Sequence, residues 1–225
     1  MTRASDIAYK TIRGLILEGR YVPGQRMIED ELAQRVGVSR TSVRDSLRRL
    51  VNDGMVRTEP NRGTFVADLS TAEIDEIFQL RAILEGHATA QAALNAKTED
   101  LDALERIAGD IEALLDRADL TPDELFARFQ SSNNEFHGTL LRASGSKRLQ
   151  VLAKPLIELP LVLMKNQNWP GEVSVRRSNQ QHMEIIEALR ARDPLLGKLR
   201  TQSHIMSTRP RAMVEESLHG LNLLS

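Results

Sequence analysis

Residues 36–54, VGVSRTSVRDSLRRLVNDG, contain a turn at Gly37 and then a segment whose two helical faces differ in polarity. Ser39 is the expected N-cap of this helix, and Gly54 is expected to end it. One face is an apolar stripe at helical spacing, formed by Val43, Leu47, Leu50 and Val51. The other face is polar and carries Arg40, Thr41, Arg44 and Arg48. The segment therefore predicts a helix that packs on one side and leaves arginines exposed on the other.

The flanking residues predict a small folded head around this helix. Before it, residues 29–36 form a short helix that Gly37 closes, and Ser5 is the expected cap of a first helix ended by Gly19. After it, two short alternating segments surround PNRG, which predicts a β-hairpin with a basic tip. Helix, tight turn, helix and hairpin together predict a winged helix-turn-helix.

The polar helix face suits a nucleic-acid duplex. A helix-turn-helix places the start of its second helix in the major groove, where arginine can bind guanine with two hydrogen bonds and hydroxyls can bind phosphate. An ordinary solvated helix face is the alternative, but the preceding turn and the basic hairpin favour DNA. The candidate DNA-binding residues are Arg35, Ser39, Arg40, Thr41, Ser42, Arg44, Arg48, Arg62 and Gly63.

Residues 19–66 resemble the winged-helix domain of GntR-type bacterial transcription regulators. The shared features are the turn PG, the acidic E.ELA segment, GVSR..VR..L..L...G and the terminal G.FV. The resemblance implies that Arg40, Thr41 and Arg44 contact bases and phosphates, with Ser39 at the cap and Gly63 in the wing. Asp30 departs from the pattern, because several relatives carry a DNA-contacting arginine there.

Composition favours a helical fold and a cytosolic setting. Only 4% of the 225 residues are aromatic whereas 41% are hydrophobic, so aliphatic side chains fill the core. The chain has no cysteine, no long apolar run and no signal-peptide pattern at its start, so we expect a cytoplasmic protein without a membrane partner. Its net charge is −1, but Lys and Arg outnumber Asp and Glu only in residues 1–69.

Beyond residue 69 the pattern changes to amphipathic helices. Start signals are Ser70 with Glu73, Thr121 with Pro122 and Glu124, and Asp193 with Pro194. We expect helices at about 71–95, 98–118, 122–143, 146–165, 174–191 and 194–217, the fourth kinked by Pro155 and Pro160. The expected fold is mostly α: a winged-helix DNA-binding domain at 1–69, then an all-α antiparallel bundle at 70–225 for effector binding and dimerisation.

Three histidines lie at the centres of the expected bundle helices. Asn133 and His137 are four residues apart on an apolar face, His182 interrupts a second apolar stripe, and His204 lies in the last helix. Imidazoles from three helices can hold a divalent metal, with zinc expected and nickel or another transition metal as the alternative. Hydrogen-bonded core histidines are the other interpretation, and the residues alone leave both open.

A stretch of about 150 residues beyond the winged helix resembles the FCD effector domain of the FadR subfamily. The matching segments are NNEFHGTLLRASGSKRL, QHMEIIEALRARDP and SHIM. The resemblance implies a metal bound by Asn133, His137, His182 and His204 beneath a cavity for a small organic acid. Asn133 stands where many relatives have Asp, as in the VanR-like branch, and this amide brings no charge to the metal.

Arg81 shares an inward stripe with Glu85 on the first bundle helix. It could bind an effector carboxylate, but we favour an ion pair with Glu85. We expect a homodimeric repressor whose binding to operator DNA is modulated by a carboxylate effector. A metal-dependent hydrolase is the competing function, and it lacks an evident general base because Glu135 projects elsewhere. A nucleic-acid-binding module without a sensor role would leave the buried histidines unexplained.

Overall fold

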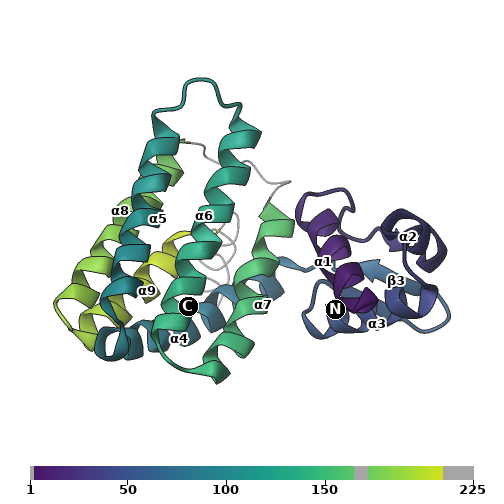
Figure 1. Cartoon of the computed structure of the whole chain (residues 1–225), viewed down its shortest axis with the longest axis horizontal. Helices are drawn as coiled ribbons and strands as arrows, with labels where there is room; N and C mark the ends of the chain where they lie inside the picture. Colours follow the sequence, from purple (N-terminus) through teal and green to yellow (C-terminus); the bar gives the residue numbers. More distant parts are fainter. Residues whose placement is uncertain (1–2, 165–171, 210–225) are drawn as a thin grey trace, which may run out of the picture. The chain divides into compact units, whose positions relative to one another are not determined.

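The computed structural model describes residues 3–164 and 172–209. The chain forms two compact units, the first made chiefly of Met1–Ser70 and the second chiefly of the chain from Thr71 onwards. Figure 1 shows the first unit as a small group of helices with a sheet and the second as a set of longer helices. The mostly helical fold class is therefore confirmed.

The first unit is a winged helix-turn-helix. Its elements are α1 (Ala4–Leu17), β1 (Arg26–Met27), α2 (Glu29–Val36), α3 (Arg40–Asn52), β2 (Val56–Glu59) and β3 (Gly63–Val66). The strands form an antiparallel sheet in the order β1-β3-β2, with Glu59 opposite Gly63 at the hairpin end. The hairpin was predicted, whereas β1 was not, because two residues are too short for an alternating pattern.

Local signals explain where these helices start and stop. Gly37 adopts a φ of 73° and closes α2 by donating its N–H to the Ala33 carbonyl. Ser39 caps α3 by accepting a hydrogen bond from the N–H of Ser42 at 3.2 Å. The expected Ser5 cap is wrong, because α1 already begins at Ala4 and Arg3, at the N-cap position, makes no side-chain cap.

The hydrophobic side of α3 confirms most of the predicted stripe. Val43, Leu47 and Leu50 are buried against the rest of the unit, whereas Val51 is 38% exposed. Ile12 and Ile16 of α1 contribute to the same compact unit as buried residues. Packing of α1 and α2 against α3 therefore fixes the buried side of α3, so its polar side faces outward.

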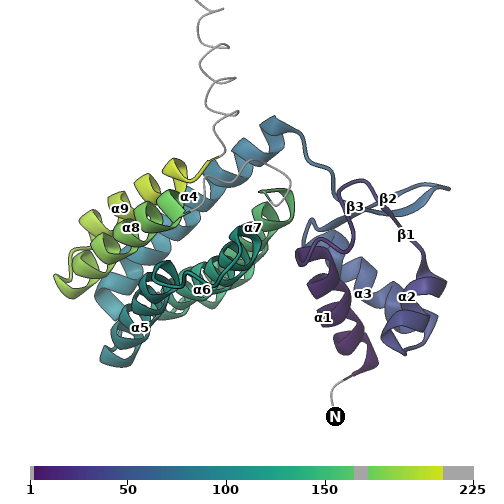
Figure 2. The same ribbon diagram turned by 90° about the horizontal axis from the view of Figure 1, so that it is seen from above.

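The second unit is a bundle of long helices. They are α4 (Thr71–Asn95), α5 (Thr98–Leu115), α6 (Pro122–Ala143), α7 (Lys147–Met164), α8 (Glu172–Arg190) and α9 (Pro194–Ser207). Figure 2 shows α4, α8 and α9 side by side, with α5, α6 and α7 across from them. Consecutive helices α5 and α6, and likewise α8 and α9, pack against each other. None of the described helices has the length and apolar character needed to cross a bilayer.

Capping residues and helix ends agree with most expectations. Thr121 and Glu124 form the predicted capping box, and the Asp193 carboxylate accepts hydrogen bonds at the start of α9. α5 ends at Leu115, before the expected residue 118, and α9 ends at Ser207. Residues 210–217 of the expected last helix lie outside the described residues. α7 runs as one helix through both prolines.

Candidate DNA interface and metal centre

The predicted DNA-binding side chains lie on the surface of the first unit. Ser42 is half-buried, and the exposed residues are Arg35, Ser39, Arg40, Thr41, Arg44, Arg48, Arg62 and Gly63. All but two of them belong to α2, α3 and the turn between them, while Arg62 and Gly63 lie at the hairpin. Gly63 has a φ of 106°, a conformation that favours glycine, so the tip of the wing depends on this residue type.

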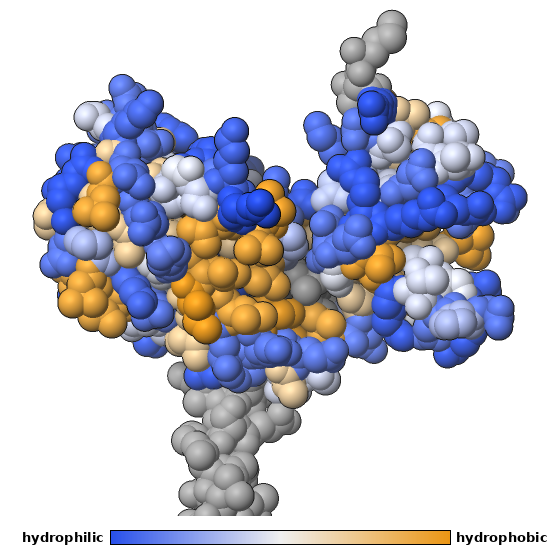
Figure 3. Space-filling view, turned by 90° about the horizontal axis from the view of Figure 1, so that it is seen from below, coloured by the Kyte–Doolittle hydropathy of each residue, from blue (hydrophilic) through white to orange (hydrophobic). Residues whose placement is uncertain are grey.

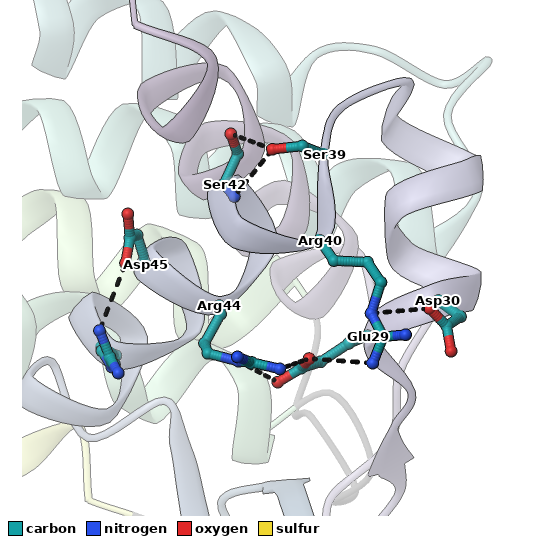
Figure 4. A network of polar contacts seen from close by, with 8 residues as sticks. Glu29, Asp30, Ser39, Arg40, Ser42, Arg44 and Asp45 are labelled. Atoms are coloured by element: carbon teal, nitrogen blue, oxygen red, sulfur yellow. Dashed lines mark hydrogen bonds and ion pairs between the residues drawn. The ribbon is translucent and has the colours of Figure 1, made fainter.

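Two exposed arginines of α3, Arg40 and Arg44, are paired with acidic residues at the start of α2. Arg44 donates from Nε to Oε1 of Glu29 at 3.1 Å and from Nη2 to Oε2 at 2.7 Å. Arg40 Nε lies 2.9 Å from Oδ1 of Asp30, and Arg48 pairs with Asp45 within α3. Figure 4 shows Arg44, Glu29, Arg40 and Asp30 joined in one network, because Oε2 of Glu29 also lies 3.8 Å from Nη2 of Arg40. The hydrogen bond from Arg44 holds the pKa of Glu29 below its usual range.

The second unit brings three predicted histidines together. His137 on α6, His182 on α8 and His204 on α9 are each at most 1% exposed. One ring nitrogen from each lies within 4.8 Å of the other two. The His137 and His204 rings stack with Nε2 atoms 3.4 Å apart, and the His182 ring stacks on Phe136. Residues from three helices thus meet in the interior of one unit.

Two further side chains position this cluster, and sequence reasoning missed their role. Glu85 Oε2 lies 2.6 Å from Nδ1 of His137, and Gln181 Oε1 lies 3.0 Å from Nδ1 of His204. The signal for Glu85 was its place on the apolar stripe of α4. The predicted Arg81–Glu85 ion pair is present, with Arg81 Nε donating to Oε1 at 2.8 Å. Burial alone raises the pKa of Glu85, but the charges and hydrogen bonds of Arg81 and His137 lower it to about 2.

The residues present fit a bound metal ion. Both ring nitrogens of His182 are buried and have no hydrogen-bond partner among the described residues, although buried polar groups are normally satisfied. Burial also holds the pKa values of His182 and His204 well below their usual range, so these rings are neutral, the form that binds metals. Asn133 lies one turn before His137 on α6 and is half-buried. A cation among these rings would satisfy His182.

A winged helix joined to a helical bundle with a buried histidine cluster defines a class of protein, the DNA-binding transcription regulators with a second helical domain. The family described as "Bacterial regulatory proteins, gntR family" matches residues 4–66, and the family described as "FCD domain" matches residues 76–207. The chain belongs to the FCD-containing GntR regulators, the FadR/VanR-like subfamily. It is a transcription regulator rather than an enzyme.

Individual relatives agree with this assignment. The chain is 26% identical over 196 residues to the HTH-type transcriptional regulator YdhC of Bacillus subtilis, covering 87% of this chain and 85% of that protein. It is 28% identical over 196 residues to the "Probable D-xylose utilization operon transcriptional repressor" of Paenarthrobacter nicotinovorans, covering 87% and 82%. Among solved structures, McbR/YncC of E. coli has the same fold, with a TM-score of 0.79 at 20% identity over 96% of this chain and 100% of that one.

Proposed function

We propose that this regulator is a cytoplasmic repressor whose operator binding responds to a small organic acid held at a metal centre in its bundle. Residues 1–69 are assigned to operator DNA, and residues 70–225 to the effector and to dimerisation. The observation that carries this proposal is the buried His182. Its ring nitrogens have no hydrogen-bond partner among the described residues, and one of them lies within 4.8 Å of a ring nitrogen of His137 and of His204. A relative named as an operon repressor supports the direction of regulation.

The proposed DNA interface follows from exposure and donor chemistry. Arg40 and Arg44 offer guanidinium groups to guanine bases and phosphates, whereas Ser39, Thr41 and Ser42 offer hydroxyls and the free N–H groups of the first helical turn to phosphate. Arg35 on α2 and Arg48 on α3 add two further exposed cations. Arg62 and Gly63 place the wing near the backbone or the minor groove. Asp30, which departs from the family pattern, pairs with Arg40.

The proposed metal ligands are Asn133, His137, His182 and His204. A divalent ion, with zinc favoured by the neutral imidazoles, would supply a positive centre that attracts an effector carboxylate. Glu85 orients His137 through Nδ1, which leaves Nε2 for the metal, as carboxylates beside ligating histidines commonly do. Arg81 is a candidate effector contact through the N–H groups that Glu85 does not use.

A homodimer is proposed because a two-fold operator needs two recognition helices. Figure 3 shows a broad hydrophobic area on the surface of the bundle. Large apolar side chains exposed on α4 and α7 include Leu80, Ile83, Val151 and Leu152. Exposed apolar area of this kind is typical of surfaces that pair with another protein. The bundle therefore offers a surface for a second copy.

The test measures how organic acids change DNA affinity. A labelled duplex selected from a randomised pool is titrated with protein, with zinc or a chelator, and with mono-, di- and tricarboxylic acids. We expect at least one acid to shift the dissociation constant about tenfold in zinc, within the usual range of coupling between sites. His182→Leu should lose this response, whereas His87→Leu, an exposed histidine on α4, should keep it. A response that survives His182→Leu, or no response to any acid, would refute the proposal.

A further inference from the structure

The two acidic residues that pair with the arginines of α3 differ in how they are placed. The Glu29 side chain is 27% exposed, about half as exposed as its partner Arg44 at 53%. The Asp30 side chain is 59% exposed, as much as Arg40 at 60%. Glu29 is therefore the less exposed of the two acids, and its carboxylate lies between two guanidinium groups: it forks with Arg44, and its Oε2 also lies 3.8 Å from Nη2 of Arg40 (Figure 4). Asp30 pairs with Arg40 at the surface.

Glu29 binds one particular edge of the Arg44 guanidinium group. Its two carboxylate oxygens accept from Nε and Nη2, which is the side-on fork of an arginine–carboxylate pair. Among the described residues, no hydrogen bond engages Nη1 of Arg44. The end of the guanidinium group, Nη1 with the second N–H of Nη2, is thus still available for a second fork. Guanine presents O6 and N7 in the major groove as the acceptors that such a fork fits.

We propose that Glu29 is a specificity-determining positioning residue: it holds Arg44 by its Nε–Nη2 edge so that the Nη1–Nη2 end meets guanine in a fixed orientation. This inference rests on the proposed assignment of Arg44 to base reading. A free arginine side chain loses rotamer entropy when it binds a base and can turn to a phosphate instead. An arginine held by a carboxylate has already lost that freedom before it binds DNA. Glu29 therefore raises the preference of Arg44 for the correct base over other bases at that position.

The chain provides a matched control in the same helical turn. Glu29, Asp30 and Glu31 all lie in the first turn of α2, where negative charge is favourable near the helix N-terminus. Glu31 is exposed and forms no ion pair with an arginine among the described residues. Glu31→Gln therefore removes the same charge from the same turn without touching Arg44. Any loss of net negative charge near DNA acts in both variants, while the fork is lost only in Glu29→Gln.

The experiment selects duplexes from a randomised pool with the full-length protein. Wild type, Glu29→Gln, Glu31→Gln and Arg44→Ala are then titrated against the preferred duplex, every single-base substitution of it and a scrambled duplex. Anisotropy is measured well below the melting temperature of each variant. We expect Glu29→Gln to relax discrimination about tenfold at the base pair that Arg44→Ala also relaxes, since one bidentate base contact discriminates by roughly that factor or more. Affinity for the scrambled duplex should change equally in Glu29→Gln and Glu31→Gln.

A second variant separates charge from geometry. Glu29→Asp keeps the charge but withdraws the carboxylate by one methylene, so it should relax the same base pair as Glu29→Gln. The inference is overturned if Glu29→Gln keeps the wild-type base profile, or if it changes affinity for all duplexes alike as Glu31→Gln does. If Arg44→Ala itself leaves the base profile unchanged, the assignment of Arg44 fails instead.

Discussion

At the scale of single residues, the buried polar cluster is the feature that ordinary packing does not explain. Arg81, Glu85, His137 and His204 form a continuous chain of contacts in the interior of the bundle. His182 adjoins this chain without a hydrogen-bond partner among the described residues. An unsatisfied buried polar group costs roughly 1 to 3 kcal/mol. A bound cation would offset that cost, which is the physical basis of the proposed metal centre.

Replacing His182 by leucine should separate the destabilising effect of its unsatisfied buried ring from its proposed role as a metal ligand. In the presence of chelator we expect His182→Leu to be as stable as the wild type or up to about 2 kcal/mol more stable, because an unsatisfied polar ring is removed. With zinc, the wild type should gain about 2.7 kcal/mol at 100 times its dissociation constant, and the variant should gain nothing. Thermal melts with chelator and with zinc check this. An equal zinc shift in both proteins would contradict it.

Removing the charge of Glu85 should destabilise the bundle strongly. Glu85→Gln leaves the Arg81 guanidinium, 5% exposed, without its carboxylate. Breaking one partner of a buried ion pair costs about 3 to 5 kcal/mol. The surface pair Arg106–Glu135 is the matched control, and Glu135→Gln should cost far less because solvent screens both side chains. Urea unfolding with chelator measures both. Similar losses for the two variants would mean that the buried pair contributes no more than a surface pair.

The sequence was informative at this scale only along each helix. The Arg81–Glu85 pair was predicted because residues four apart share a helical face. The contact of Glu85 with His137 joins residues on α4 and α6, and it depends on how the two helices are aligned. Pairing of Arg44 with Glu29 likewise joins α3 to α2. Periodicity places a residue on a face, but it does not determine which residue of another helix lies opposite.

At the scale of elements, two helical glycines differ in how closely another helix approaches them. A Cβ atom added at Gly86 of α4 would lie 2.8 Å from Cγ of Gln202 and 3.3 Å from the Lys198 carbonyl oxygen on α9. An added Cβ at Gly109 of α5 would meet nothing within 4 Å, and this residue is exposed. The two positions share helical backbone but differ in surroundings.

Alanine substitutions at these glycines should therefore have opposite signs. Gly86→Ala should destabilise the protein by about 1 to 3 kcal/mol through overpacking between α4 and α9. Gly109→Ala should stabilise it by about 0.5 to 1 kcal/mol, because alanine loses less conformational freedom in a helix than glycine. Denaturant midpoints of the two variants against the wild type measure the difference. A stabilising Gly86→Ala would show that the α4–α9 packing is looser than described.

Element boundaries were predictable where a side chain caps the backbone. Ser39, Thr121 and Asp193 each accept a hydrogen bond from an N–H at a helix start, as their positions predicted. Ser5 failed as a cap because the helix extends one residue before it. β1 was missed because its two residues pair with β3 through backbone contacts that leave no periodic pattern.

At the scale of the whole molecule, a basic head and a bundle with a buried polar centre lie on one chain. The family match covers both parts, and it makes the protein a transcription regulator. The order of winged helix and bundle was predictable from the change in pattern near residue 70. The identity of the effector depends on side chains from several helices, and no single segment of sequence specifies it.

The most direct test of the account is the affinity for DNA of the wild type and of Arg44→Ala, each measured with the selected duplex and with a scrambled duplex. For the wild type, we predict a dissociation constant on the order of 10⁻⁸ M or tighter on the selected duplex, at least about 10³-fold tighter than on the scrambled one. Arg44→Ala should weaken only the specific complex substantially, by roughly 5- to 150-fold. Equal affinities of the wild type for both duplexes, or no effect of Arg44→Ala on the selected one, would contradict reading of DNA by α3.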